Sequence, residues 1–163
     1  MILVGILAHA LLAAPVTQAP ASIDPCSLLT QKEAADAFGT PVKPARHFSV
    51  PSSGDQCFYE STKSKSYFIS VTVQRFTGSG RTVETWKRLY ERLTARGDAE
   101  RIANLGDAAY YARQRDFLVA KGDWEVQINA ILSEASYDFS PNSDKTAEKK
   151  AARAAAEHVL ARL

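Results

Sequence analysis

Two cysteines and three histidines are the residues of this sequence whose chemistry could serve a nucleophile or a metal site. A thiol nucleophile needs a base beside it, and a zinc site needs several cysteine or histidine ligands at short spacing. His47 lies in a proline-rich stretch and His158 lies near the end of the sequence, and neither has a second histidine or a cysteine at ligand spacing. The pattern therefore predicts no metal, no cofactor and no thiol nucleophile.

Carboxylates and glycines are the next candidates for chemistry. Asp107, Asp116 and Asp123 each stand beside a predicted turn, where aspartate commonly bonds the nearby backbone. Paired acid–base carboxylates stay open as an alternative, because such partners meet only in three dimensions. The glycine-rich segment from Gly78 to Arg81 lacks the Lys-Ser or Lys-Thr ending of a phosphate-binding loop, so we interpret it as a turn into a helix.

Cys26 and Cys57 are most simply interpreted as a disulfide, because they are the two cysteines of a chain with an export-like N-terminus. The bond would close a loop of roughly 30 residues, which the chain-entropy estimate values at about 3.7 kcal/mol. The pairing and the export signal support each other, since a disulfide needs an oxidising compartment.

The N-terminal stretch has the strongest bias in composition. Residues 1–21 contain no Lys, Arg, Asp or Glu, and residues 2–14 are almost wholly apolar. The run is shorter than the ~20 apolar residues of a membrane span and is typical of a secretory signal with small residues at its end. We predict cleavage near Ala21, loss of His9 with the signal, and a secreted or periplasmic protein without a transmembrane segment in its mature part. A buried N-terminal strand or helix is the alternative, since no basic residue precedes the apolar run.

Length and charge limit the remaining possibilities. A chain of 163 residues suits one domain, here residues 22–163. Its net charge of +2 comes from 20 basic and 18 acidic residues. This balance argues against a nucleic-acid partner, which would require clustered basic charge.

Local signals predict three helices and seven extended segments. Asp24 and Pro25 start a short turn, Thr30 and Glu33 form a capping box, and Gly39 ends the helix that follows. Apolar residues at helical spacing predict the other helices, whereas alternation and turn residues predict the strands. The predicted helices are residues 30–39, 83–97 and 146–162. The predicted strands are residues 43–50, 57–60, 67–74, 99–103, 108–113, 116–121 and 124–132.

The order of these elements indicates an internal repeat. It predicts an α+β domain with a single antiparallel sheet, helices packed mainly on one face, and the order α-β-β-β-α-β-β-β-α.

Two pairs of adjacent aromatic residues are the candidate ligand or partner surface. Phe58 with Tyr59 and Tyr110 with Tyr111 lie on predicted strands, so one member of each pair points away from the core. The outward rings could form a platform for a ligand or partner, or they could lie under a helix on the second face.

Three short segments resemble a known group of proteins. They are residues 24–30 (DPCSLLT), 57–59 (CFY) and 105–110 (LGDAAY). The segments are similar to exported bacterial proteins of unknown function, many of them actinobacterial lipoproteins. The resemblance implies an α+β fold with a curved antiparallel sheet, akin to PsbP-like domains, and it brings no catalytic residues. Ile23, Asp24 and Pro25 precede Cys26 where lipoproteins have a small apolar run, so a lipid anchor is not implied.

Three functions follow as hypotheses. The leading one is an exported, non-enzymatic binding or interaction module whose partner is an envelope protein or a small ligand. The second is a carrier, for which we expect an aromatic-lined cavity above about 300 Å³. The third is a cell-envelope enzyme, for which His47 or His158 should meet an aspartate in a cleft.

Overall fold

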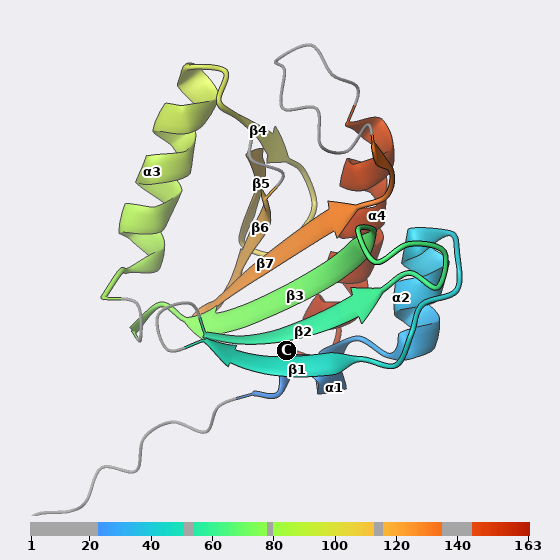
Figure 1. Cartoon of the computed structure of the whole chain (residues 1–163). Coiled ribbons are helices and arrows are strands. Elements are labelled where there is room, and N and C mark those ends of the chain that lie inside the picture. Colours follow the sequence, from blue (N-terminus) through green and yellow to red (C-terminus); the bar gives the residue numbers. More distant parts are fainter. Residues whose placement is uncertain (1–22, 51–53, 78–79, 113–115, 135–144) are drawn as a thin grey trace, which may run out of the picture.

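One antiparallel sheet organises the chain (Figure 1). The computed structural model describes residues 23–50, 54–77, 80–112, 116–134 and 145–163. The strands in this part are β1 (Arg46–Val50), β2 (Gly54–Glu60), β3 (Phe68–Arg75), β4 (Ala99–Ile102), β5 (Ala108–Ala112), β6 (Asp116–Lys121) and β7 (Trp124–Ile131). The helices are α1 (Pro25–Leu28), α2 (Gln31–Phe38), α3 (Val83–Ala95) and α4 (Thr146–Leu160). The α+β class and the single antiparallel sheet are confirmed.

The strand order is β1-β2-β3-β7-β6-β5-β4, so the last strand of the chain lies at the centre of the sheet. The predicted order is wrong by one strand, because four strands follow α3. All four were predicted as separate segments, and the repeat order counts residues 116–121 and 124–132 as one unit where the structure has β6 and β7. Strand β4 is short and pairs with β5 at the sheet edge, with Ile102 opposite Ala109. The short α1 also precedes α2. The internal repeat and the PsbP-like fold stay predictions.

The larger core lies between the sheet and three helices, α1, α2 and α4. Alternate residues of β3 and β7, such as Val71 and Ile128, point into this core and are fully buried. Helix α4 contributes small residues, which let its backbone approach the sheet closely. They are Ala151, Ala152, Ala155 and Ala156.

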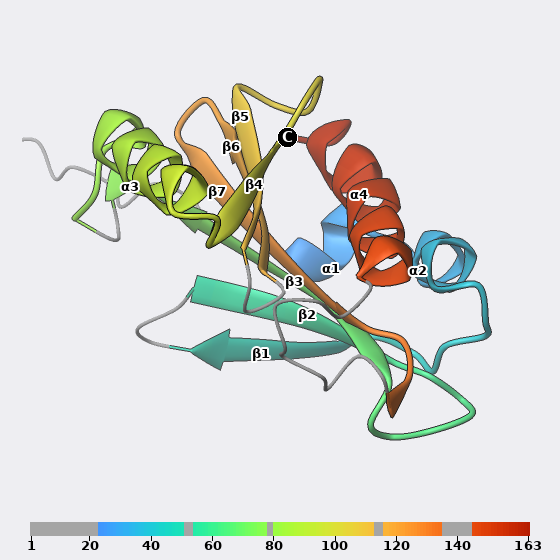
Figure 2. The ribbon, with the colours of Figure 1, turned by 90° about the horizontal axis from the view of Figure 1, so that it is seen from above.

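Helix α3 is the exception to the prediction that helices pack on one face. It lies on the opposite face, and β4, β5 and β6 stand between it and α4 (Figure 2). Its Trp86 is fully buried against Tyr110, with ring centroids 5.5 Å apart, and Tyr90 stacks on the same tyrosine at 5.3 Å. Burial raises the pKa of the Tyr90 hydroxyl to about 12. This aromatic cluster fixes α3 over the β5–β6 half of the sheet.

A buried carboxylate ties α3 to the sheet. Glu125 of β7 is 3% exposed, and its Oε1 accepts a 2.8 Å hydrogen bond from the indole nitrogen of Trp86. Its Oε2 accepts hydrogen bonds from Gln74 Nε2 at 2.9 Å and Arg81 Nη2 at 2.6 Å. Each oxygen of this carboxylate thus has a donor, as a buried charge requires. Gly78 and Ser79, of the segment predicted to be a turn, lie outside the described residues.

The start of the described chain is fixed by caps and by the disulfide. The side chain of Asp24 accepts a hydrogen bond from the Cys26 backbone, and Thr30 and Glu33 form the predicted capping box. Cys26 and Cys57 are bonded, with their Cα atoms 5.0 Å apart, so the predicted disulfide is confirmed. Among the described residues, no helix is both long and apolar enough to span a membrane.

Candidate functional site

Three phenylalanines form a row across strands β1, β2 and β3. We call Phe48, Phe58 and Phe68 the aromatic row. The centroids of Phe48 and Phe58 are 6.3 Å apart, and those of Phe58 and Phe68 are 4.6 Å apart. Strand register explains the row, because Phe58 lies opposite Arg46 of β1 and Ser70 of β3. Arg46 is two residues from Phe48, and Ser70 is two residues from Phe68. The three rings therefore share one face of the sheet.

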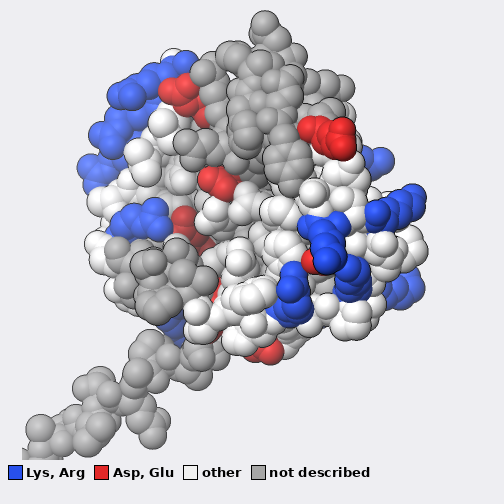
Figure 3. Space-filling model, viewed as in Figure 1, with Lys and Arg blue, Asp and Glu red and all other residues white. Residues whose placement is uncertain are grey.

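The aromatic row lies on the face opposite the larger core, beyond the part that α3 covers. Phe48 is 42% exposed and is the exposed large hydrophobic residue of the described chain, whereas Phe58 and Phe68 are half-buried. The strand that carries Phe48, β1, is at the edge of the sheet and pairs with β2 alone among the described strands. Figure 3 shows cations at two sides of this face, over α3 and at the opposite side, with white uncharged atoms and a few acidic groups among those between them. An exposed aromatic on an edge strand is a surface that a partner can bury.

A cation and its carboxylate partner lie beside Phe48 and Phe58 of the aromatic row. The guanidinium of Arg46 lies 5.5 Å from the Phe48 ring centre and 5.3 Å from the Phe58 ring centre, within the range of cation–π attraction. Arg46 Nη2 is also 3.2 Å from Oε2 of Glu60, whose other oxygen bonds the ammonium of Lys43. The bond from Lys43 holds the pKa of Glu60 below its ordinary value. Arg46 is thus oriented over the rings by its carboxylate partner.

Polar side chains lie beside the aromatic row on β3, β7 and β6. Ser70 and Thr72 are buried, and Gln56 Nε2 donates to Thr72 Oγ1 at 3.3 Å. Gln127 Nε2 donates to Asp116 Oδ1 at 2.8 Å. Burial raises the pKa of Asp116, and the bond from Gln127 acts against that rise. In this strip, amide groups are hydrogen-bonded to hydroxyl and carboxylate groups next to the apolar rings.

The three aspartates considered for acid–base chemistry occupy different places. Asp116 begins β6, whereas Asp107 and Asp123 lie near the turn that ends it. Asp107 Oδ2 accepts a 2.6 Å hydrogen bond from the backbone of Gly122, which is the turn-forming role. Asp123 is exposed and lies 3.8 Å from Arg75 Nη1. The structure does not bring Asp116 together with the other two.

Of the four aromatics singled out by the sequence, Phe58 alone lies in the aromatic row. Tyr59 and Tyr111 point into the larger core, and Tyr110 lies under α3. The hydroxyl of Tyr59 donates to the carbonyl of Leu29, and burial raises its pKa to about 12. The sequence reasoning missed Phe48 and Phe68. Phe48 stands among the polar residues Arg46, His47 and Ser49, and all four are exposed, so no local alternation marks its position.

The two described histidines each lie beside a carboxylate. His47 Nε2 is 3.7 Å from Asp55 Oδ1, and Ser49 Oγ donates to the same oxygen at 2.6 Å. A serine nucleophile would have to bond the imidazole, so this exposed trio has the wrong connectivity for a catalytic triad. His158 Nδ1 is 3.2 Å from Glu33 Oε1. Among the described residues, no cluster of three metal-ligating side chains is found. His9 lies outside these residues.

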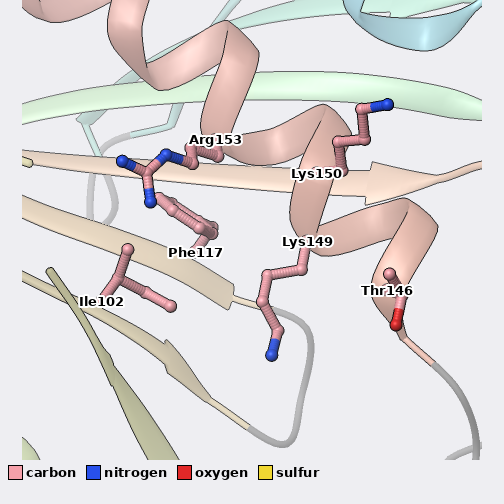
Figure 4. Close-up of a pocket in the computed structure, with 6 residues that line it drawn as sticks. All are labelled: Ile102, Phe117, Thr146, Lys149, Lys150 and Arg153. Atoms are coloured by element: carbon pink, nitrogen blue, oxygen red, sulfur yellow. The ribbon is translucent and has the colours of Figure 1, made fainter.

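A cavity of about 270 Å³ lies on the other side of the sheet, against α4 (Figure 4). Its lining contains a single aromatic residue, Phe117, and three cations. It is smaller and more charged than the aromatic-lined cavity expected of a carrier for an apolar ligand.

Comparison of the chain with protein-family models, with curated proteins and with solved structures finds no match.

Proposed function

We propose that this protein is an extracytoplasmic, non-enzymatic interaction module that binds a protein partner on the aromatic row. The observation that carries the proposal is the exposure of Phe48 on the edge strand β1, in contact with Phe58 and beside Arg46. Interfaces are enriched in aromatic and arginine side chains, and apolar groups of a partner would remove the exposed ring from water.

The geometry also suggests how the partner is held. The outer edge of β1 pairs with no described strand, so its backbone groups are available to an extended segment of a partner. Such a segment would place alternate side chains over Phe48 and leave the others toward solvent. Recognition would then combine backbone hydrogen bonds with apolar contact and with the cation of Arg46.

The location outside the cytoplasm is part of the same proposal. The disulfide between Cys26 and Cys57 supports an oxidising compartment, as does the apolar N-terminal stretch. The resemblance to exported bacterial proteins points the same way. Mass spectrometry of the protein from its host should find a start near Ser22. An intact Met1 would contradict export through a cleaved signal.

A photo-crosslinking experiment tests the interaction surface. A benzoylphenylalanine placed at Phe48 should give a specific protein adduct in the host, whereas the same group at Lys32 of α2 should not. Lys32 is a matched control because its side chain is 84% exposed on the opposite face. The adduct at position 48 should weaken when Phe58→Ser removes the neighbouring ring. Equal adducts at both positions, or none at position 48, would refute the proposal.

A further inference from the structure

The cavity against α4 combines an apolar floor with a cationic rim. Its volume is about 270 Å³. The lining residues are Ile102, Phe117, Thr146, Lys149, Lys150 and Arg153. Every ionisable side chain in this lining is a cation, so the cavity favours a ligand with negative charge.

Two strands supply the apolar floor. Phe117 of β6 is 0% exposed and belongs to the larger core, where its ring centroid lies 6.2 Å from that of Tyr111. Ile102 of β4 is half-buried beside it. The cavity therefore ends at the side chains of the core, and the half-buried Ile102 provides apolar surface that a ligand can cover.

Helix α4 supplies the cations. Lys149 bonds Glu100 of β4, and its ammonium lies 5.4 Å from the ring centre of Tyr111. Arg153 Nε lies 3.0 Å from Glu157 Oε1, one turn further along the helix. Both ion pairs are open to solvent, where such pairs contribute little, so each cation can exchange its carboxylate for an anionic ligand.

The directions of these side chains are visible in Figure 4. Arg153 and Lys149 extend from α4 toward the strands on the side of Phe117 and Ile102, whereas the ammonium of Lys150 points away from them. Lys149 and Arg153 thus lie at different sides of the apolar floor, and Lys150 is directed away from it.

We propose that this cavity binds a small amphiphile with one anionic group, a carboxylate or phosphate ester, on a short apolar chain. The anionic group bonds one of the two cations, Lys149 or Arg153, and is attracted by the other, and the chain lies on Ile102 above Phe117. The volume is just below the ~300 Å³ at which sites for drug-sized ligands begin, so the ligand or its inserted end is small. The site is on the opposite face from the aromatic row, and it stands or falls independently of the proposed partner surface.

Titration of the full-length, ¹⁵N-labelled protein with four probes, followed by NMR, tests the proposal. Octanoate and octyl phosphate carry both features, octanol lacks the charge, and inorganic phosphate lacks the chain. We expect saturable shifts at Ile102, Thr146, Lys149 and Arg153 with one or both amphiphiles, and about tenfold weaker binding of octanol and of phosphate. The stronger amphiphile identifies the headgroup. Equal binding of octanol, equal binding of phosphate, or shifts elsewhere would overturn the proposal.

Variants separate the two parts of the site. Arg153→Gln and Lys149→Gln should each weaken amphiphile binding about tenfold and leave octanol binding unchanged. Ile102→Thr should weaken the binding of octanoate and octanol alike. Lys32→Gln is the control, since that exposed cation on α2 also pairs with a carboxylate one turn away. If Lys32→Gln weakens binding as much as Arg153→Gln does, the attraction is general and no site exists.

Discussion

The indole nitrogen of Trp86 donates a 2.8 Å hydrogen bond to the carboxylate of Glu125. Both side chains are buried, and they connect the first half of α3 to the central strand of the sheet. Among the described helices, α3 alone lies on the face of the sheet opposite the larger core. The contact between Trp86 and Glu125 therefore helps to keep this face covered beside the aromatic row. The attachment of α3 to the sheet thus depends on a carboxylate that lies outside the aromatic row.

Replacing Glu125 with Gln should destabilise the protein by about 3 kcal/mol. The substitution keeps the shape but removes the charge that Arg81 meets, and it sets an amide donor against other donors. Urea denaturation measures the free energy of unfolding. Glu84→Gln on the exposed side of α3 is the control and should cost less than about 0.5 kcal/mol. Similar losses in the two variants would show that the buried bonds of Glu125 contribute nothing.

Loss of the disulfide should lower the melting temperature by roughly 10 °C. Cys26 and Cys57 are 31 positions apart, and a cross-link over such a loop contributes about 3.7 kcal/mol through the unfolded chain. Calorimetry of Cys26→Ser measures the shift. Reducing agent should lower the melting temperature of the wild type to that of Cys26→Ser/Cys57→Ser and leave the double variant unchanged. If reducing agent leaves the melting temperature of the wild type unchanged, the disulfide does not stabilise the protein.

Acid should remove a contribution of Glu33 to stability. Hydrogen bonds from Arg162 and from the Thr30 backbone lower the pKa of Glu33 from its ordinary 4.5 to about 2. Because the folded value is the lower one, the stabilisation is complete above pH 4.5 and is lost as the pH falls toward 2. The advantage of the wild type over Glu33→Gln in the free energy of unfolding should therefore shrink across this window. An advantage of Glu33 that stays constant from pH 5 to pH 2 would contradict the assignment.

Gly106→Ala should destabilise the protein more than a substitution at another glycine with positive φ. Gly106 has φ +57°, and an added Cβ would lie 2.5 Å from the carbonyl oxygen of Ala120. Gly39 has φ +73° with open space around it, so Gly39→Ala costs only the backbone strain, about 1 kcal/mol. We expect about 2 kcal/mol more for Gly106→Ala in urea denaturation, because the backbone beside β6 must move. Equal losses in the free energy of unfolding would mean that the backbone at Gly106 accommodates the added Cβ without strain.

Much of the local structure is predictable from the sequence because its causes are local. The capping box of Thr30 and Glu33 and the end of α2 at Gly39 depend on neighbouring residues, and so does the extent of β3. The disulfide is predictable because Cys26 has one possible partner. Local signals extend no further than this.

Features that depend on distant pairing were missed. Glu125 alternates with apolar residues and resembles a solvent-facing position, but donors from residues 74, 81 and 86 enclose it. The aromatic row requires the registers of β1 with β2 and of β2 with β3, which no local pattern gives. Of its members only Phe58 was identified, through its neighbour Tyr59. The α4 cavity likewise depends on which strands that helix covers.

The central position of β7 has a kinetic consequence. Strands β1 to β3 and strands β4 to β6 can each pair as local hairpins. Among the described strands, β7 alone pairs with both groups, with Phe68 of β3 opposite Ile131. Closing that pairing requires bringing together segments far apart in the chain, which slows folding. A nascent chain that has not yet supplied Trp124 to Ile131 therefore holds two separate sheet fragments with exposed edges. Folding becomes cooperative only when the last strand arrives, and until then the chain is open to aggregation or to a chaperone.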